Sequence, residues 1–373
     1  MKIQYNNGYY EGEVNAAGVP HGKGVRRWTN GNVYEGDFQN GTIAGYGTFT
    51  ESSKNKYVGE CLNGSAHGRG IFTWTNGDTY DGDFVNGKRT GKGTFTSANG
   101  YIYKGDFQDG SITGYGTFTD SNKNKYVGEC LNSLPHGRGI FTWANGDTYD
   151  GDFVNGQRHG KGKFTWTSGN VYEGDFVDGK CYGKGVLTWT NGDTYYGDVV
   201  DGNFHGNGTF TWANGDTYDG DFVNGQRHGK GVLTCANGDT YYGDFVDNNF
   251  HGKGTFTWAD GDIYKGDFQD GHLTGEGEAY FDNFKTMLFG TFENLNLTCG
   301  NIHEKFDQYP DRTLFKTVEG GKVVSTYIFF ENGNSYTGER NGVVPHGKGT
   351  MYRKDGTDLE GIFENGEYVG PAE

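Results

Sequence analysis

The chain has little of what marks several protein classes. Its 373 residues include 5 Cys, 5 Pro and 3 Met. No run of residues approaches the roughly 18 apolar residues of a membrane-spanning helix. An odd, small number of cysteines argues against a disulfide framework and favours free thiols. The first residues also lack the apolar core of a signal peptide, so we expect a cytoplasmic chain that is not secreted.

Basic residues are also scarce relative to acidic ones. The 32 Lys and Arg stand against 48 Asp and Glu, which gives a formal net charge of -16. Such a field repels polyanions unless basic residues gather on one face. The sequence therefore predicts no nucleic-acid partner, and it disfavours binding to anionic phospholipid.

Glycine and aromatic residues are abundant instead. There are 69 Gly, 26 Tyr, 27 Phe and 7 Trp. Disordered chains are poor in aromatic residues, and collagen needs Gly at every third position, which is absent here. Each Gly in a helix costs about 1 kcal/mol relative to Ala. The composition therefore predicts an all-β protein.

One period of 23 residues organises most of the chain. Gly follows each periodic tyrosine two positions later, and all seven tryptophans fall in one further column of the same period. Coincidence does not produce such columns, so the chain is a tandem array. The tyrosines in register are Tyr34, Tyr57, Tyr80, Tyr103, Tyr126, Tyr149, Tyr172, Tyr195, Tyr218, Tyr241 and Tyr264.

The unit spanning residues 214–236 shows what each repeat encodes. It contains two segments in which apolar and polar residues alternate, and Asn-Gly bounds each segment. Alternation predicts strands, and Asn-Gly predicts hairpin turns. Tyr218, Gly220 and Phe222 share one face, and the Thr and Asp residues between them share the other.

The glycines within the strands predict a specific form of packing. Gly normally weakens a strand, but here it leaves room for an aromatic ring to lie on bare backbone. We therefore expect Tyr and Trp rings to stack over glycine gaps on one face. Representative residues of this aromatic face are Tyr80, Phe84, Phe95, Tyr149, Phe153, Trp166, Tyr218, Phe222 and Trp212.

A single hairpin of this size buries too little to fold alone. The fold class predicted is therefore an elongated tandem array of 23-residue antiparallel β-hairpins, stacked into a twisted, solenoid-like sheet. We expect a continuous array over 1–293 and further repeats and a tail over 331–373. The motif breaks over 294–330, which we expect to be an irregular segment that forms a kink, a cap or a dimer surface.

The polar face carries charges in order. An acidic residue follows the strand Gly, and a residue between the loop glycines is usually basic. If Gly82 faces Gly93 across the hairpin, Asp83 faces Lys92. Two interpretations stay open: a ladder of cross-strand ion pairs worth about 0.2–1 kcal/mol each, or a surface that binds a protein partner.

Reactive or ligand-binding side chains do not stand apart from the repeat. Eight histidines occupy one loop column, but successive ones would lie about 10 Å apart, too far to share a metal ion. Hydrogen bonds that stabilise turns are the better account of this column. The Gly-x-Gly runs enter strands rather than helices, which argues against a phosphate loop. We predict no catalytic residue, no metal and no cofactor.

Four lysines mark the most basic points on the chain. Lys54 and Lys56 flank one turn, and Lys123 and Lys125 flank another, 69 residues later. They are the candidate residues for contact with lipid.

The recurring motif resembles a known family. Residues 149–162 read Tyr-x-Gly-Asp-Phe-x-x-Gly-x-x-His-Gly-Lys-Gly, which looks like the MORN repeat (membrane occupation and recognition nexus). The resemblance covers residues 5 to about 293 and again 330–366. A chain made almost wholly of such repeats resembles the cytoskeletal scaffold proteins of protists.

The resemblance implies a non-enzymatic scaffold or adaptor that offers an extended surface to protein partners. It also suggests a cytoplasmic protein associated with the cytoskeleton or a membrane. The irregular C-terminal region separately suggests a homodimer formed through it. The alternative that the resemblance implies is an adaptor that binds phosphoinositides at a membrane surface.

Overall fold

A computed structural model describes residues 1–283 and 285–372 of the chain. Every regular element of these residues is a β-strand, so no helix in this part of the chain could span a membrane. The chain divides into two compact units, residues 1–190 and 191–373, which are described separately. The fold is all-β and consists of tandem antiparallel hairpins, as the sequence predicts.

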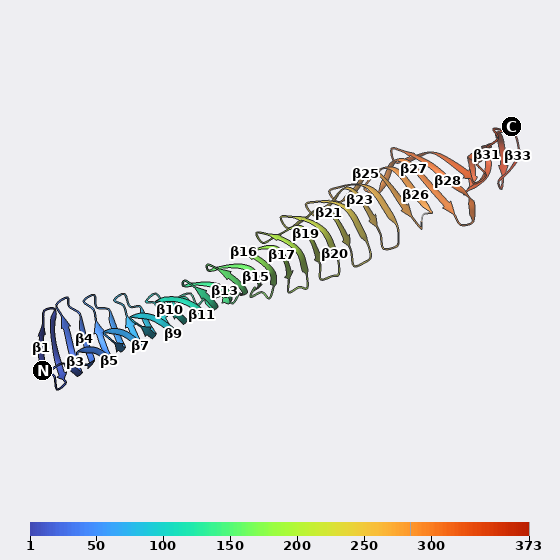
Figure 1. Ribbon diagram of the computed structural model, residues 1–373. Coiled ribbons are helices and arrows are strands. Elements are labelled where there is room, and N and C mark those ends of the chain that lie inside the picture. Colours follow the sequence, from blue (N-terminus) through green and yellow to red (C-terminus); the bar gives the residue numbers. More distant parts are fainter. Residues whose placement is uncertain (284, 373) are drawn as a thin grey trace. The chain divides into compact units, whose positions relative to one another are not determined.

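In the first unit each strand pairs antiparallel with the next along the chain (Figure 1). Its strands are β1 (Lys2–Tyr5), β2 (Gly8–Val14), β3 (Pro20–Trp28), β4 (Val33–Gln39), β5 (Thr42–Thr50), β6 (Lys56–Leu62), β7 (Ser65–Thr73), β8 (Thr79–Val85), β9 (Lys88–Thr96), β10 (Ile102–Gln108), β11 (Ser111–Thr119), β12 (Lys125–Leu131), β13 (Leu134–Thr142), β14 (Thr148–Val154), β15 (Gln157–Thr165), β16 (Val171–Val177) and β17 (Lys180–Thr188).

The second unit repeats the same pairing of neighbours. Its strands are β18 (Thr194–Val200), β19 (Asn203–Thr211), β20 (Thr217–Val223), β21 (Gln226–Thr234), β22 (Thr240–Val246), β23 (Asn249–Thr257), β24 (Ile263–Gln269), β25 (His272–Phe281), β26 (Thr286–Glu293), β27 (Asn296–Phe306), β28 (Tyr309–Glu319), β29 (Lys322–Phe330), β30 (Ser335–Asn341), β31 (Val344–Tyr352), β32 (Leu359–Glu364) and β33 (Glu367–Gly370).

The turn within most hairpins depends on two residues with positive φ. Between β14 and β15, Asn155 has φ 49° and Gly156 has φ 83°. A two-residue turn needs positive φ at both positions if its twist is to match that of the strands, and Asn-Gly supplies this at the lowest cost. The Asn-Gly pairs of the sequence therefore fix the register of the hairpins.

Each Tyr ring of the repeat lies on two facing glycines. Gly151 of β14 pairs with Gly162 of β15. A Cβ placed on Gly162 would lie 2.4 Å from Cε2 of Tyr149, and one on Gly151 would lie 2.4 Å from its Oη. The Tyr149 hydroxyl donates to the carbonyl of Asp152 at 3.0 Å. The Tyr149 ring is therefore wholly buried against the backbone of both strands. Any side chain larger than that of glycine at position 151 or 162 would occupy its place.

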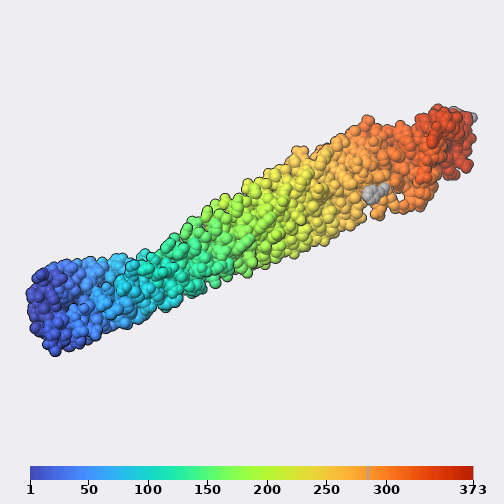
Figure 2. All heavy atoms as spheres, viewed as in Figure 1, coloured from blue at the N-terminus to red at the C-terminus, as the bar shows by residue number. Residues whose placement is uncertain are grey.

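Phenylalanine rings join one buried tyrosine to the next hairpin. Tyr149 contacts Phe153 of its own strand edge-on, with ring centroids 5.1 Å apart, and Phe176 of β16 at 4.9 Å. Tyr80 makes the same pair of contacts with Phe84 and Phe107, at 5.2 and 4.8 Å. Edge-to-face pairs stabilise by about 0.5–1.5 kcal/mol beyond the area that they bury. On the face shown in Figure 2, atoms of successive hairpins lie against one another along most of each unit.

Three arginines 69 residues apart extend this packing. The Arg89 guanidinium carbon lies 5.5–5.8 Å from the ring centroids of four aromatic residues, and the group donates to the carbonyl of Gly110 at 2.5 Å. Burial lowers the pKa of Arg89 from its ordinary value, yet a guanidinium stays charged at neutral pH. Arg158 and Arg227 occupy equivalent places. A cation thus sits among the rings in every third hairpin of this stretch.

The segment 294–330, which we expected to be irregular, contains three long strands. β27, β28 and β29 continue the antiparallel pairing from β26, so the motif is lost but the sheet is not. The pairing between β29 and β30 is short, because only Ile328 and Phe329 of β29 pair with β30. Leu314 and Ile328 also form a buried cluster with Tyr336, Val343 and Phe363.

We expect Gly162→Ala to destabilise the array by about 3 kcal/mol, because its methyl group would overlap the Tyr149 ring. Gly156→Ala is the matched control. That position is open, with its nearest atoms 3.8 Å from the added Cβ, and only its φ of 83° opposes Ala, at about 1 kcal/mol. The urea midpoints of the two variants measure this difference, and equal midpoints would contradict the packing described.

We also expect Arg89→Ala to cost about 2–3 kcal/mol, through the lost contacts with the rings and the lost hydrogen bond to Gly110. Arg89→Met, which keeps an apolar side chain among the rings, should cost less than Arg89→Ala. The neighbouring exposed Lys88 provides the control, since Lys88→Ala should change stability by less than about 0.5 kcal/mol. Thermal unfolding followed by circular dichroism ranks the three variants. A loss in Arg89→Ala no greater than in Lys88→Ala would refute a structural role for the guanidinium.

Candidate interaction surface

The aromatic face is used by the fold itself. Tyr80, Tyr149 and Tyr218 are 0% exposed, and the phenylalanines four residues after each, Phe84, Phe153 and Phe222, are 3% exposed. Phe95 is half-buried opposite Tyr80. Little of this face is left for a ligand along the regular hairpins, so most of the surface open to partners lies on the opposite, polar face.

The tryptophans lie elsewhere than expected. Trp166 and Trp212 come directly after β15 and β19, and they are half-buried at the turns. The Trp166 amide donates to the carbonyl of Asn170 at 3.0 Å, and the Trp166 ring packs beside Phe164 with centroids 4.7 Å apart. Our expectation of Trp rings over glycine gaps is therefore wrong at these positions. The strand has ended before the Trp, and the Tyr ring already covers the glycines.

A β-bulge changes the ion pairing that the sequence suggested. Gly82 does face Gly93, but the register then shifts and Asp83 faces Thr90. Lys92 lies instead beside Asp106 of the next hairpin, with Nζ 2.6 Å from Oδ1. The pairing of Asp83 with Lys92 was wrong because strand alternation alone cannot show a bulge.

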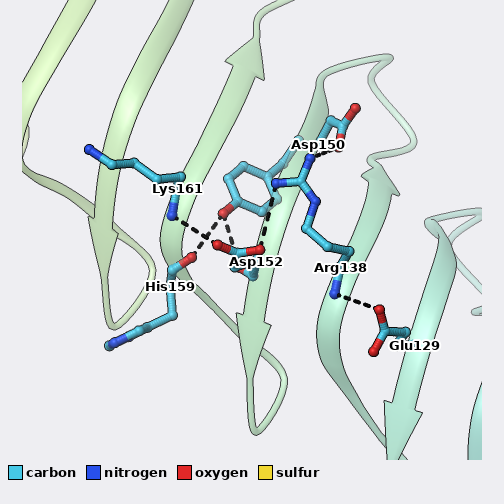
Figure 3. Close-up of polar contacts among 7 residues, drawn as sticks. Glu129, Arg138, Asp150, Asp152, His159 and Lys161 are labelled. Carbon is cyan, nitrogen blue, oxygen red and sulfur yellow. Dashed lines mark hydrogen bonds and ion pairs between the residues drawn. The ribbon is translucent and has the colours of Figure 1, made fainter.

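In several repeats the acidic residue after the strand glycine therefore contacts two hairpins, and Asp152 is an example. In Figure 3 the Asp152 carboxylate accepts a hydrogen bond from the backbone amide of Lys161, at 3.1 Å, across its own hairpin. It also lies 3.6 Å from a guanidinium nitrogen of Arg138, in the preceding hairpin. The Lys161 ammonium in turn lies 2.7 Å from Asp175 of the following hairpin. These exposed pairs contribute little each, but they recur at successive junctions between hairpins.

A broad groove crosses the polar face of the second unit. Its volume is about 740 Å³, and strand glycines such as Gly254 and Gly266 form part of its lining. One cross-strand row runs through it from β22 to β26, in register. The residues of this row are Tyr242, Thr255, Lys265, Glu278 and Phe289.

The first unit has a similar groove, of about 460 Å³, in the corresponding position. Its row joins Asp81, Thr94, Lys104 and Thr117 across β8 to β11. The two grooves thus share their geometry but differ in side chains. Variation in this row changes the surface without touching the buried rings.

Exposed tyrosines on the polar face were not singled out by the sequence analysis. Tyr242 and Tyr196 are 62% and 60% exposed, and Tyr115 and Tyr46 are 57% and 56% exposed. The positions of these tyrosines within the repeat could have identified them. Tyr46 and Tyr115 stand between loop glycines where most repeats carry Lys or Arg, and the other two directly follow a core tyrosine. Large exposed aromatic side chains of this kind are typical anchors in protein interfaces.

The four candidate lipid-contact lysines form two separate pairs. Lys54 lies in the turn before β6 and Lys56 is the first residue of β6, and Lys123 and Lys125 are placed in the same way at β12. All four side chains are exposed, and none forms an ion pair with another described residue. Six strand spacings of about 4.8 Å separate the two turns, or about 29 Å along the sheet. The structure therefore does not gather them into one basic site.

The histidine column differs from its expected role. The Tyr149 hydroxyl donates to the backbone carbonyl of His159 at 3.4 Å, so this histidine contributes its backbone and not its imidazole to the hydrogen bond. The buried Nδ1 atoms of His67 and His136 have no hydrogen-bond partner. Within residues 1–283 and 285–372, no three His, Cys, Asp or Glu side chains gather as a metal site.

Comparison with known proteins agrees with the repeat pattern. The family model of the MORN repeat matches twelve segments, eleven of them consecutive. The matched residues are 10–33, 34–52, 57–79, 80–100, 103–125, 126–148, 149–171, 172–194, 195–217, 218–240, 241–263 and 344–358. The match stops short of residues 264–343, although Tyr264 is wholly buried like the tyrosines of the matched repeats.

A similar curated protein is an inactive protein tyrosine kinase, pTKL, of Plasmodium berghei. It is 36% identical over 56 residues, which are 15% of this chain and 4% of that protein. The chain thus matches only a small part of this relative's length.

Similar solved structures include the TCP10 domain of Danio rerio CPAP. The aligned region covers 59% of this chain and 94% of that domain, with 12% identity and a TM-score of 0.29. The TCP domain of Drosophila melanogaster SAS-4, in complex with a proline-rich motif of Ana2, covers 52% and 86%, with 11% identity and a TM-score of 0.25. These scores carry no argument about function.

The family model, in contrast, matches more than half of the chain, and on that ground the chain belongs to the MORN-repeat family.

Proposed function

We propose that the chain is a non-enzymatic scaffold that binds protein partners along the polar faces of its hairpins. The observation that carries the proposal is the division between the two faces. The aromatic face is consumed by the packing of tyrosine on glycine, while the polar face presents grooves with exposed tyrosines. MORN repeats are in general interaction modules for proteins and membranes.

The groove of the second unit has the mixed character of a protein-binding surface. Lys230 and Lys253 are held in place by ion pairs with Asp244 and Asp267, at 2.7 and 2.6 Å. Tyr242 lines the same groove as these two lysines. A fixed pattern of charge around an aromatic anchor suits a partner with a defined complementary surface.

A second copy of the chain is the partner that we propose for the C-terminal region. Only Ile328 and Phe329 of β29 pair with β30, so the earlier residues of β29 lie at an edge of the sheet. Val323 and Val324 there are 53% and 54% exposed, and Tyr327 is also exposed. An apolar strand edge is a ready site for pairing with another chain.

We place this scaffold in the cytoplasm, associated with the cytoskeleton or with a membrane. Phosphoinositide binding is the alternative function, and the exposed, unpaired lysines 54, 56, 123 and 125 favour it. The net charge of -16 and the separation of the lysines into two pairs weigh against it. A scaffold role needs no such site.

The scaffold proposal predicts that changes confined to the polar groove abolish partner binding. We expect Tyr242→Ser combined with Lys265→Ser to lose proteins that the intact chain retains from an extract of its own cells. Both side chains lie on the exposed row, so stability should change by less than about 0.5 kcal/mol per substitution. Quantitative mass spectrometry of the retained proteins measures the effect.

The control for this experiment carries Asn237→Ser and Asp260→Ser, at exposed turns outside the groove. It should retain the same proteins as the intact chain. If both variants retain the same set, the groove does not bind partners. If retention is instead lost on substitution of the four lysines, and vesicles containing phosphoinositide sediment with the intact chain, the lipid-binding alternative replaces the scaffold proposal.

The dimer proposal predicts that one charge at the β29 edge separates the copies. The intact chain should have twice the chain mass of 41.0 kDa, and Val324→Lys should have the mass of one chain, because an ammonium would be desolvated in the interface. Val200→Lys, at an exposed position of β18, is the control and should stay dimeric. Light scattering after gel filtration gives the masses. A monomeric intact chain, or a dimeric Val324→Lys variant, would refute this interface.

A further inference from the structure

An apolar pocket interrupts the aromatic face at β12 and β13. Its volume is about 250 Å³. Four aromatic side chains line it, two of them nearly wholly buried. These are Tyr101, Phe118, Tyr126 and Phe141. The rings of Tyr101 and Phe118 lie 5.5 Å apart, and those of Phe118 and Tyr126 lie 6.0 Å apart.

The pocket lies at the position where the next repeat holds an arginine and the preceding repeat holds Ile112. Pro135 faces Cys130 across its hairpin, just as Arg158 faces Phe153 in the next hairpin, 23 residues later. The small proline ring and the cysteine in place of phenylalanine leave space that is filled in that hairpin. The pocket at Pro135 therefore corresponds to the place that Arg158 fills in the next hairpin, without an arginine.

The site of Arg158 shows what this environment accepts. Its guanidinium carbon lies 5.2 Å from the ring centroid of Phe164 and 5.8 Å from that of Tyr149. The same group donates to the carbonyl of Gly179. Phe141 and Tyr126 are the residues at the corresponding places around Pro135, one period earlier. Two faces of the arginine site are thus repeated in the pocket.

One difference makes the pocket more favourable to a cation. Trp143 is 15 residues before Arg158, and the residue 15 before Pro135 is Asp120. Asp120 lines the pocket, and its carboxylate accepts hydrogen bonds from the backbone and side-chain nitrogens of Asn124, both at 2.8 Å. It forms no ion pair with a described residue. A carboxylate beside aromatic rings is the chemistry that binds a guanidinium.

The nearest basic side chains do not fill this site. Lys125 directly precedes Tyr126 in β12, so strand alternation directs its side chain to the opposite face. Lys123 is exposed in the preceding turn and is not among the residues that line the pocket. The pocket therefore offers a carboxylate that has hydrogen bonds but no ion-pair partner to a cation from outside the chain.

We propose that this pocket binds the guanidinium group of an arginine side chain from a protein partner. The partner arginine would lie among the rings of Tyr126 and Phe141, pair with Asp120, and take the place that Arg158 fills in the next hairpin. This inference rests on the scaffold function proposed above, and it names the chemistry of one contact. An arginine is favoured over a lysine because its planar fork can stack on the rings and pair with a carboxylate at once.

Three seven-residue glycine–serine peptides test the proposal with the full chain. They carry a single central arginine, lysine or leucine. Saturation-transfer NMR on the central side chain, followed over a titration, gives each dissociation constant. The arginine peptide should bind several times more tightly than the lysine peptide, and the leucine peptide should bind most weakly. A leucine peptide that binds as tightly as the arginine peptide would overturn the assignment to a cation.

Matched variants locate the binding. Pro135→Arg should fill the pocket from within, as Arg158 does, and weaken binding of the arginine peptide at least about tenfold. Ala66→Arg is its control, because Ala66 occupies the same place in another hairpin, outside the pocket, and this variant should bind the arginine peptide as the intact chain does. Asp120→Asn should weaken the arginine peptide far more than the leucine peptide.

Unchanged binding in Pro135→Arg would show that the arginine peptide binds elsewhere, and absence of binding to the intact chain would refute the pocket outright. Urea midpoints of all variants show that they fold. The outcome is separate from that of the scaffold experiment, since the Tyr242 and Lys265 substitutions leave this pocket intact. If partner capture depends on the groove while the peptide fails to bind, the pocket alone is wrong.

Discussion

The structure depends on the contact of a tyrosine ring with two facing glycines. A strand normally carries a Cβ at every position, and a ring cannot then reach the backbone. Here the pair of Gly151 and Gly162 leaves the backbone bare, and Tyr149 lies across both. Its hydroxyl reaches a carbonyl of the same hairpin, so the polar end of the ring is satisfied although the ring is buried. Edge-to-face contacts with Phe153 and Phe176 then join this hairpin to the next. Every other regular feature of the array follows from this repeated unit.

This packing separates the structural face from the functional face. Side chains on the aromatic face are constrained in nearly every repeat, because a change there disturbs a ring or its glycine seat. Residues on the polar face are not limited in this way. The row that contains Tyr242 and Lys265 has different side chains from the row that contains Asp81 and Lys104, although the two rows occupy the same positions of the hairpins. The bulge adds to this arrangement, since it turns Asp152 toward both its own hairpin and the preceding one. The array can therefore vary its binding surface without losing its stability.

Much of the fold could be predicted from the sequence, because the 23-residue repeat and the two-residue alternation within each strand are both easy to recognise. The 23-residue columns identify the repeat, and alternation places Tyr218 and Phe222 on one face. The bulge could not be predicted, since it depends on the positive φ of a loop glycine, and it moved the partner of Lys92 from Asp83 to Asp106. Trp166 was misplaced because the strand ends one residue before it. Residues 294–330 lose the motif but keep strands, because hydrogen bonding along the sheet needs no tyrosine. The arginine sites were missed because they recur in every third repeat rather than in each one, and the pocket at Pro135 was missed because it depends on replacements within a single hairpin.

The ring current of Tyr149 tests the central claim most directly. In a sample labelled at glycine and tyrosine, the Hα protons of Gly162 and Gly151 should lie well upfield of ordinary strand glycines. They should also show strong through-space contacts with the ring protons of Tyr149. Ordinary chemical shifts for both glycines, with no such contacts, would mean that the ring does not lie on the backbone, and the account of the fold would fail.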